Sequence, residues 1–261
     1  MGQILSFVEP RDIFTFILGV VSSLLASYIY ALQQRHADSQ YLRALFNFGK
    51  GEVLLVVPHR AREPSSIMPR VAIEDVLAMR NIIEILGHLS ISSKIRDPGH
   101  LSDKDKQRNI VTFGGEKVNE LTAEILKKLP PGESFSFKSD PTNADRHFIQ
   151  RGATTTYISP SFDVSDDAGP HEERKDIALV LKHKNPNNPD SIVVVIAGIR
   201  GIGTWGASDH LRKKAEEIYR KKRAGHGYKK TGGYLMMIEV TYKNFDILET
   251  TVKDFLDLDG P

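Results

Sequence analysis

An uncharged run of twenty residues, from Ile13 to Leu32, constrains this chain more than any other feature. As an α-helix it would be about 30 Å long, which is the thickness of a bilayer's hydrocarbon core. The alternative is a secretory signal peptide, but Arg11 is the only basic residue before the run and no A-x-A cleavage site follows it. The sequence therefore predicts a retained transmembrane anchor over residues 1–33.

The basic residues around this run are unequally distributed. One precedes the run and three follow it, namely Arg11 on the first side and Arg35, Arg43 and Lys50 on the second. This bias predicts a single-pass topology with the C-terminal part in the cytoplasm. Within the run, Gly19, Ser23 and Ser27 recur every four residues, a small-residue spacing that favours close helix association. We therefore expect a homo-oligomer, with the lipid bilayer as a further partner.

The rest of the chain has the pattern of one α/β domain. Residues 34–51 read as a helical connector and residues 52–261 as the domain. Strands are expected at 52–57, 91–95, 109–113, 135–137, 177–181, 192–197, 234–242 and 247–252, and helices from Pro69 to about 86, at 118–129 and at 207–223. The short turn at 185–189 makes its flanking strands an antiparallel pair. Together these elements predict a three-layer, Rossmann-like mixed sheet.

One stretch departs from this pattern. Between Asp140 and Lys175, proline, serine, aspartate and glycine dominate, and only 154–158 has the character of a strand. A stretch of this length predicts a lid or a disordered insertion.

Charge and composition exclude some classes of function. The chain has no cysteine, which rules out disulfides, cysteine-ligated zinc and a cysteine nucleophile. Its net charge is +2, but residues 212–230 carry nine Lys/Arg against two Glu, which leaves −5 for the remainder. That basic run is either a solvated helix face or a contact for anionic lipid or a phosphate-bearing partner. Aromatic residues do not alternate with the basic ones, so the sequence argues against a nucleic-acid polymer as a partner.

The strongest chemical signal lies between the strand at 192–197 and the following helix. Gly201, Gly203 and Gly206 satisfy G-x-G-x-x-G in a strand–turn–helix context, in which glycines let a phosphate approach the helix N-terminus. Arg200 and Thr204 are expected to add contacts to the same anion. No acidic residue follows about twenty positions on, and an antiparallel hairpin precedes the motif, so a nucleotide-like ligand is favoured over NAD. Glycines needed only for packing are the alternative.

Two further strand ends carry polar residues. Gly114 and Gly115 follow one strand, and Asn119 and Thr122 are three apart on the next helix, where they either share a ligand or, for Asn119, cap the helix. His59 and Arg60 follow the first strand of the domain. Because ligands of open α/β sheets bind beyond the carboxyl ends of the strands, we expect these groups to converge.

The catalytic inventory favours a binding function over an enzyme. No G-x-S-x-G elbow, H-E-x-x-H pair or P-loop is present. Glu74 and Asp75 are adjacent and on a helix point about 100° apart, so they cannot act as a facing dyad. The histidines are scattered, and we expect no metal site and no cofactor.

With these residues in view, the domain resembles a bacterial Rossmann-like domain of the nucleotide-ligand type, for which no reaction is assigned. Four stretches carry the resemblance: Pro69-Arg70 with Glu74, Asp75 and Ala78; Gly114-Gly115 with Asn119 and Thr122; Asn185-Pro186 with Asn188-Pro189; and Ala197-Gly198 with Gly201, Gly203, Thr204 and Ala207. The chain departs from it at Glu116, where similar domains have proline. The resemblance implies a nucleotide-like ligand fold joined to varied partner modules, which is more typical of sensors than of metabolic enzymes. With the predicted anchor, we expect a location at the bacterial inner membrane.

The leading hypothesis is a membrane-anchored sensor or effector that binds a nucleotide-like ligand and controls the assembly of its anchors. Membrane-acting effectors of bacterial antiphage signalling share this arrangement. The expected ligand-binding residues are His59, Arg60, Gly114, Gly115, Asn119, Thr122, Arg200, Gly201, Gly203 and Thr204. The alternatives are a membrane-tethered, NAD-type nucleotide hydrolase using Glu74, Asp75 or His59, and a scaffold without a small ligand.

Overall fold

The computed structural model describes residues 10–49, 51–58, 71–130, 134–140, 147–152, 155–159, 172–224 and 232–258, with side chains except at 10–14 and 31–35. The chain divides into two compact units, Met1–Gln40 and Tyr41–Pro261. Each unit is considered by itself.

A single long helix, α1 (Pro10–Phe46), contains the uncharged run and continues beyond it, which confirms that the run is helical. In the first unit every side chain from 15 to 30 is exposed, including the large apolar Phe16, Leu24 and Tyr28. Within the described part of the chain, no helix combines the length and the apolar character needed to cross a membrane. The anchor expected over residues 1–33 stays a prediction from the sequence.

The second unit is built on a seven-stranded mixed sheet with the order β10-β9-β7-β8-β3-β1-β2. Its parallel part consists of β1 (Val53–Val56), β2 (Ser93–Arg96), β3 (Asn109–Phe113) and β8 (Asn188–Gly198). The antiparallel part adds β7 (Arg174–Asn185), β9 (Tyr234–Lys243) and β10 (Asp246–Asp257). The central strands are continuous apolar runs because side chains on both faces are buried.

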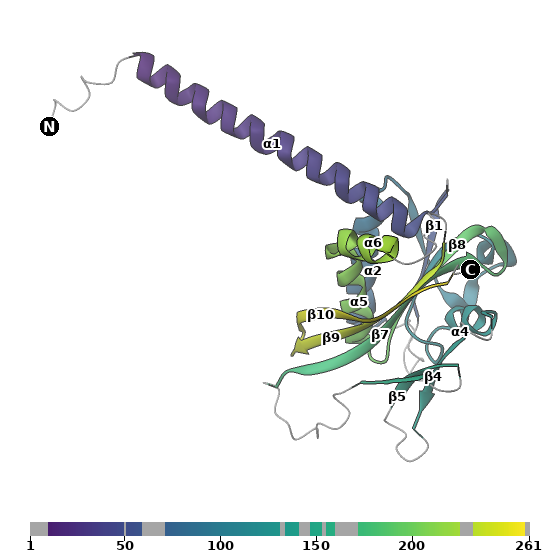
Figure 1. Cartoon of the computed structure of the whole chain (residues 1–261). Coiled ribbons are helices and arrows are strands. Elements are labelled where there is room, and N and C mark those ends of the chain that lie inside the picture. Colours follow the sequence, from purple (N-terminus) through teal and green to yellow (C-terminus); the bar gives the residue numbers. More distant parts are fainter. Residues whose placement is uncertain are drawn as a thin grey trace, which may run out of the picture. The chain divides into compact units, whose positions relative to one another are not determined.

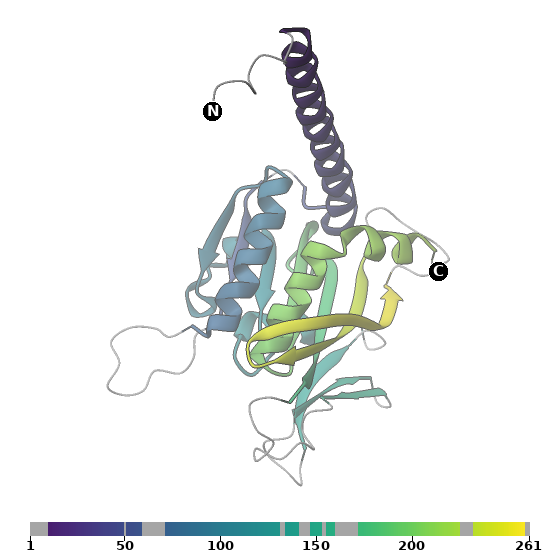
Figure 2. The same ribbon diagram turned by 90° about the vertical axis from the view of Figure 1, so that its left-hand side faces the viewer.

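Each face of this sheet is covered by a separate layer (Figures 1 and 2). One layer contains α2 (Ile73–His88), α5 (Gly201–Lys213), α6 (Ala215–Ala224) and the end of α1, where Leu45 and Phe46 are fully buried. The other contains α4 (Glu120–Lys127) and a small antiparallel sheet of β4 (Phe135–Ser139), β5 (His147–Arg151) and β6 (Thr155–Ile158). The expected three-layer α/β architecture is therefore confirmed.

Three sequence predictions need correction. The helix expected at 207–223 begins at Gly201 and is divided into α5 and α6 at Lys214, so the glycine motif forms the first turns of a helix. The stretch at 140–175 is partly ordered, because β5 and β6 extend the sheet begun by β4. A short 3₁₀ helix η1 (Pro98–His100) and α3 (Asp103–Lys106), which begins with a Ser102–Asp105 capping box, were not anticipated.

Candidate functional site

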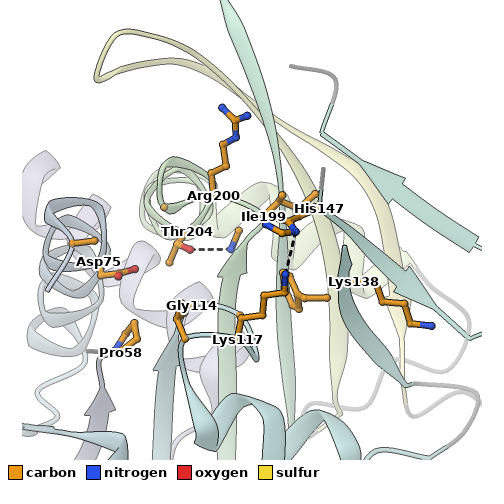
Figure 3. A pocket seen from close by; sticks show the side chains of 15 residues that line it. Pro58, Asp75, Gly114, Lys117, Lys138, His147, Ile199, Arg200 and Thr204 are labelled. Carbon is orange, nitrogen blue, oxygen red and sulfur yellow. Dashed lines mark hydrogen bonds between the residues drawn. The ribbon is translucent and has the colours of Figure 1, made fainter. Parts of the chain in front are cut away.

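Three strand ends meet at one edge of the large sheet and line a cavity of about 210 Å³ (Figure 3). Pro58 follows β1, Gly114 follows β3, and Gly198 ends β8. The chain leaves β1 through α2 on one face and β3 through α4 on the other, which makes this edge a topological switch point. The three strand ends converge as expected, but the polar residues expected after β1, His59 and Arg60, lie outside the described residues.

The cavity has two walls of opposite chemistry. Asp75, from the first turn of α2, lies on one side, and Lys117 and His147 lie on the other (Figure 3). Lys138 and Arg200 also line the cavity, so among the described residues of the lining there are three permanently cationic residues and one carboxylate. A site with this balance favours a ligand that carries negative charge.

The glycine motif has a different role from the one expected, because a buried carboxylate already occupies it. Asp176 of β7 accepts hydrogen bonds from the backbone amides of Arg200 (3.0 Å) and Gly203 (2.9 Å) through Oδ2, and from Ile177 N (2.9 Å) through Oδ1. Burial raises the pKa of Asp176 to about 7, although these amides and the Arg200 charge oppose the shift. The amide groups that the motif was expected to offer to a phosphate are thus used within the protein.

The register of the β7–β8 hairpin explains how Asp176 reaches this position. Ala178 pairs with Gly198, and Ile199 N donates to Ile177 O at 2.9 Å. If the same register continues by one more pair, Asp176 lies opposite Arg200, directly before the start of α5. A contact of this kind depends on strand pairing and has no local signature in the sequence.

The glycines around α5 are required by close packing. A Cβ on Gly203 would lie 2.4 Å from Asp176 Oδ2, and a Cβ on Gly206 would lie 2.4 Å from a methyl group of Val240. A Cβ on Gly198 would lie 2.4 Å from both Arg200 O and Thr204 N. The Thr204 hydroxyl accepts a hydrogen bond from Gly198 N at 2.9 Å. Packing, the alternative considered for the motif, accounts for two of its three glycines, Gly203 and Gly206, and also for Gly198 before it.

Asn119 and Thr122 are buried beneath the site, with polar partners inside the protein. Asn119 Oδ1 caps α4 by accepting from the amides of Leu121 (3.1 Å) and Thr122 (3.3 Å). Its Nδ2 donates to Phe113 O and to Thr112 Oγ1, and the hydroxyls of Thr112 and Thr122 lie 2.8 Å apart. This network fixes α4 to β3, and neither residue belongs to the cavity lining. Asn119 is the helix cap that the sequence offered as its alternative.

The small sheet supplies one wall of the cavity and is tied to the turn after β3. Glu116 Oε1 accepts from Phe137 N at 2.9 Å, and the Phe137 ring would lie 3.1 Å from a Cβ on Gly115. At its far side the Tyr157 hydroxyl donates to Asp254 Oδ2 of β10 at 2.5 Å. Burial, followed by the Asp254 charge, raises the pKa of Tyr157 to about 12. The wall is thereby attached to the large sheet at two separate places.

A cluster of three polar groups joins this wall to the turn before α4. Lys117 Nζ lies 2.5 Å from Ser139 Oγ and 3.2 Å from His147 Nδ1, and the latter two atoms are 3.1 Å apart. Ser139 ends β4 and His147 begins β5, and the antiparallel pairing of the two strands sets them opposite each other. The sequence analysis missed both residues, because His147 lies within the stretch predicted to lack regular structure and Ser139 lies just before it, beyond the strand expected at 135–137.

The predicted site residues are thus only partly brought together. Gly114, Gly115, Arg200, Gly201 and Thr204 line the cavity. Gly203, Asn119 and Thr122 lie outside its lining, and His59 and Arg60 fall outside the described residues. The guanidinium of Arg200 points away from Asp75 and Lys117 (Figure 3), and its charge acts on Asp176 and Tyr242. Whether any of these residues binds a ligand stays a prediction.

Comparison with protein-family models finds no match, and comparisons with curated proteins and with solved structures likewise find none.

Proposed function

We propose that the α/β unit is the ligand-binding part of a membrane-associated sensor or effector, and that its ligand is a small phosphate-bearing, nucleotide-like molecule. One observation carries the proposal: a charged cavity at the switch point of the sheet, lined by the ends of β1, β3 and β8. Open α/β sheets bind ligands in this position. The excess of cationic side chains in the lining favours an anionic ligand over a neutral one.

We expect the full-length chain, purified in detergent, to retain or bind a nucleotide-like molecule in native mass spectrometry. Val118→Trp should weaken that binding at least tenfold, because Val118 lines the cavity and an indole there would fill part of its volume. The Val118 side chain is 49% exposed, so the fold has room for the larger residue.

Val76→Trp is the matched control for this experiment. Val76 is a comparably exposed valine, on α2, that does not line the cavity. Equal binding by both variants, or no binding by the wild-type chain to any nucleotide tested, would contradict the proposal. Turnover of a bound nucleotide that is lost in Asp75→Asn would instead favour the hydrolase alternative.

The membrane part of the proposal rests on α1. Its side chains from 15 to 30 carry no charge and are exposed on all sides of the helix. An apolar helical surface needs cover from water, and lipid provides it on every side at once. Gly19, Ser23 and Ser27 would then allow neighbouring copies of α1 to approach one another.

A charge placed in the middle of this surface tests the membrane assignment. We expect the wild-type chain to remain in the membrane pellet after alkaline carbonate washing, and Leu24→Lys with Leu25→Lys to release it. Each lysine near the centre of a membrane helix costs about 3 kcal/mol. Gln40→Lys, on an exposed polar position of the same helix, should leave the chain in the pellet. Release of the wild-type chain by carbonate would overturn the assignment.

A further inference from the structure

The position of a phosphate group within the cavity follows from which polar groups are already used. The backbone amides at the start of α5 already have an acceptor, because Asp176 Oδ2 lies within 3.0 Å of the amide nitrogens of Arg200 and Gly203. A second anion at that place would also meet the charge of Asp176. At the N-terminus of α4, the amides of Leu121 and Thr122 likewise donate to Asn119 Oδ1. The N-terminus of α2 also borders the site, through Ala72 and Asp75, and there the Asp75 carboxylate would repel a phosphate.

The wall opposite Asp75 carries a cluster of polar side chains, in which Lys117 and His147 line the cavity and Ser139 lies next to them, outside its lining. Lys117, Ser139 and His147 form a triangle with sides of 2.5, 3.1 and 3.2 Å. An ammonium group carries three N–H donors, and two contacts within this triangle leave capacity for a third acceptor. A hydroxyl and an imidazole beside an ammonium are groups that donate hydrogen bonds to phosphate oxygens.

We infer that the phosphate of the ligand binds at the triangle of Lys117, Ser139 and His147, and that the uncharged end of the ligand faces Asp75. This inference rests on the proposed function and specifies the ligand's orientation. A carboxylate accepts hydrogen bonds from sugar hydroxyls or from the amino group of a base and repels a phosphate. Asp75 and the triangle lie on opposite sides of the cavity (Figure 3), so one ligand can satisfy both.

The test compares the four ribonucleoside 5′-monophosphates with the corresponding nucleosides, titrated against the full-length chain in detergent. The wild-type chain should bind at least one nucleotide roughly 10- to 100-fold more tightly than its nucleoside, as expected for a charge-assisted contact. In Lys117→Gln this ratio should fall to about one, with the affinity for the nucleoside nearly unchanged.

Lys138→Gln provides the matched control, because Lys138 also lines the cavity and carries the same charge, but its ammonium points away from the triangle (Figure 3). It should keep most of the ratio, whereas Ser139→Ala should reduce the ratio in part. If Lys117 only holds the small sheet in place, Lys117→Gln will weaken both compounds equally and the inference is wrong. If the wild-type chain binds none of the eight compounds, the proposed function itself fails.

Discussion

Replacing Gly198 by alanine should destabilise the α/β unit more than any other single methyl addition at the site. The new Cβ would lie 2.4 Å from Arg200 O and 2.4 Å from Thr204 N, both of which are backbone atoms. Backbone cannot yield as a side chain can, so the strand end and the start of α5 must separate. We expect the free energy of unfolding to fall by about 3 kcal/mol or more. Urea unfolding of the full-length chain, followed through Trp205, the only tryptophan, measures the loss.

Gly201→Ala is the control from the same motif. A Cβ at Gly201 would lie 3.1 Å from both Cβ and Cδ of Glu74, so Cδ can rotate away and the Glu74 Cβ has to shift only slightly. The change in unfolding free energy should stay within about 1 kcal/mol. Equal losses in the two variants would show that the motif is sensitive to side chains in general and not to the close approach at Gly198.

Removal of the buried carboxylate should have an effect of similar size. Asp176→Ala leaves the amides of Ile177, Arg200 and Gly203 without the acceptor that they have in the wild-type chain. A buried polar group without a partner costs about 1–3 kcal/mol. At pH 5 we expect the variant to lose about 3 kcal/mol of unfolding free energy, measured in the same urea titration.

The pH dependence of that loss distinguishes the role of the carboxylate from a simple packing defect. Burial raises the pKa of Asp176 from 3.8 to about 7 in the folded chain, so the folded state binds the proton more tightly than the unfolded state. The contribution of Asp176 to stability is therefore complete below pH 3.8 and decreases as the pH rises through 7, by about 1.4 kcal/mol per unit. The difference between wild type and Asp176→Ala should be smaller at pH 8 than at pH 5. A constant difference would contradict the raised pKa.

Much of the fold follows from local patterns. The strands β1, β3 and β8 are recognisable in the sequence because both of their faces are buried, which requires uninterrupted apolar runs. By contrast β5 has a single fully buried side chain, Ile149, and a strand with so little burial has no apolar pattern to detect. The strand β5 was missed for this reason, together with His147 at its start, whereas the sequence did indicate strands at the positions of β4 and β6.

The candidate site was predictable in position and not in detail. Three strand ends converge as parallel strands require, and this depends only on strand order. The roles of individual residues depend on partners distant in sequence. The local sequence around Asn119 fits both a cap of α4 and a ligand contact. Its hydrogen bond to Thr112 holds the side chain inside the protein, where it caps the helix. Gly203 likewise fits a phosphate-binding turn until Asp176, 27 residues earlier, is known to fill it.

The internal carboxylate at the start of α5 has a consequence for selectivity in a cell. Phosphate metabolites are abundant, and an open glycine turn would bind whichever of them is most concentrated. Asp176 belongs to the chain, so it competes for the turn at a fixed effective concentration that no metabolite can dilute. The amides at the start of α5 are therefore not available to bind abundant dinucleotides or free phosphate. If the cavity binds the proposed ligand, its walls, which come from distant segments, must then provide the selectivity, by shape as well as by charge.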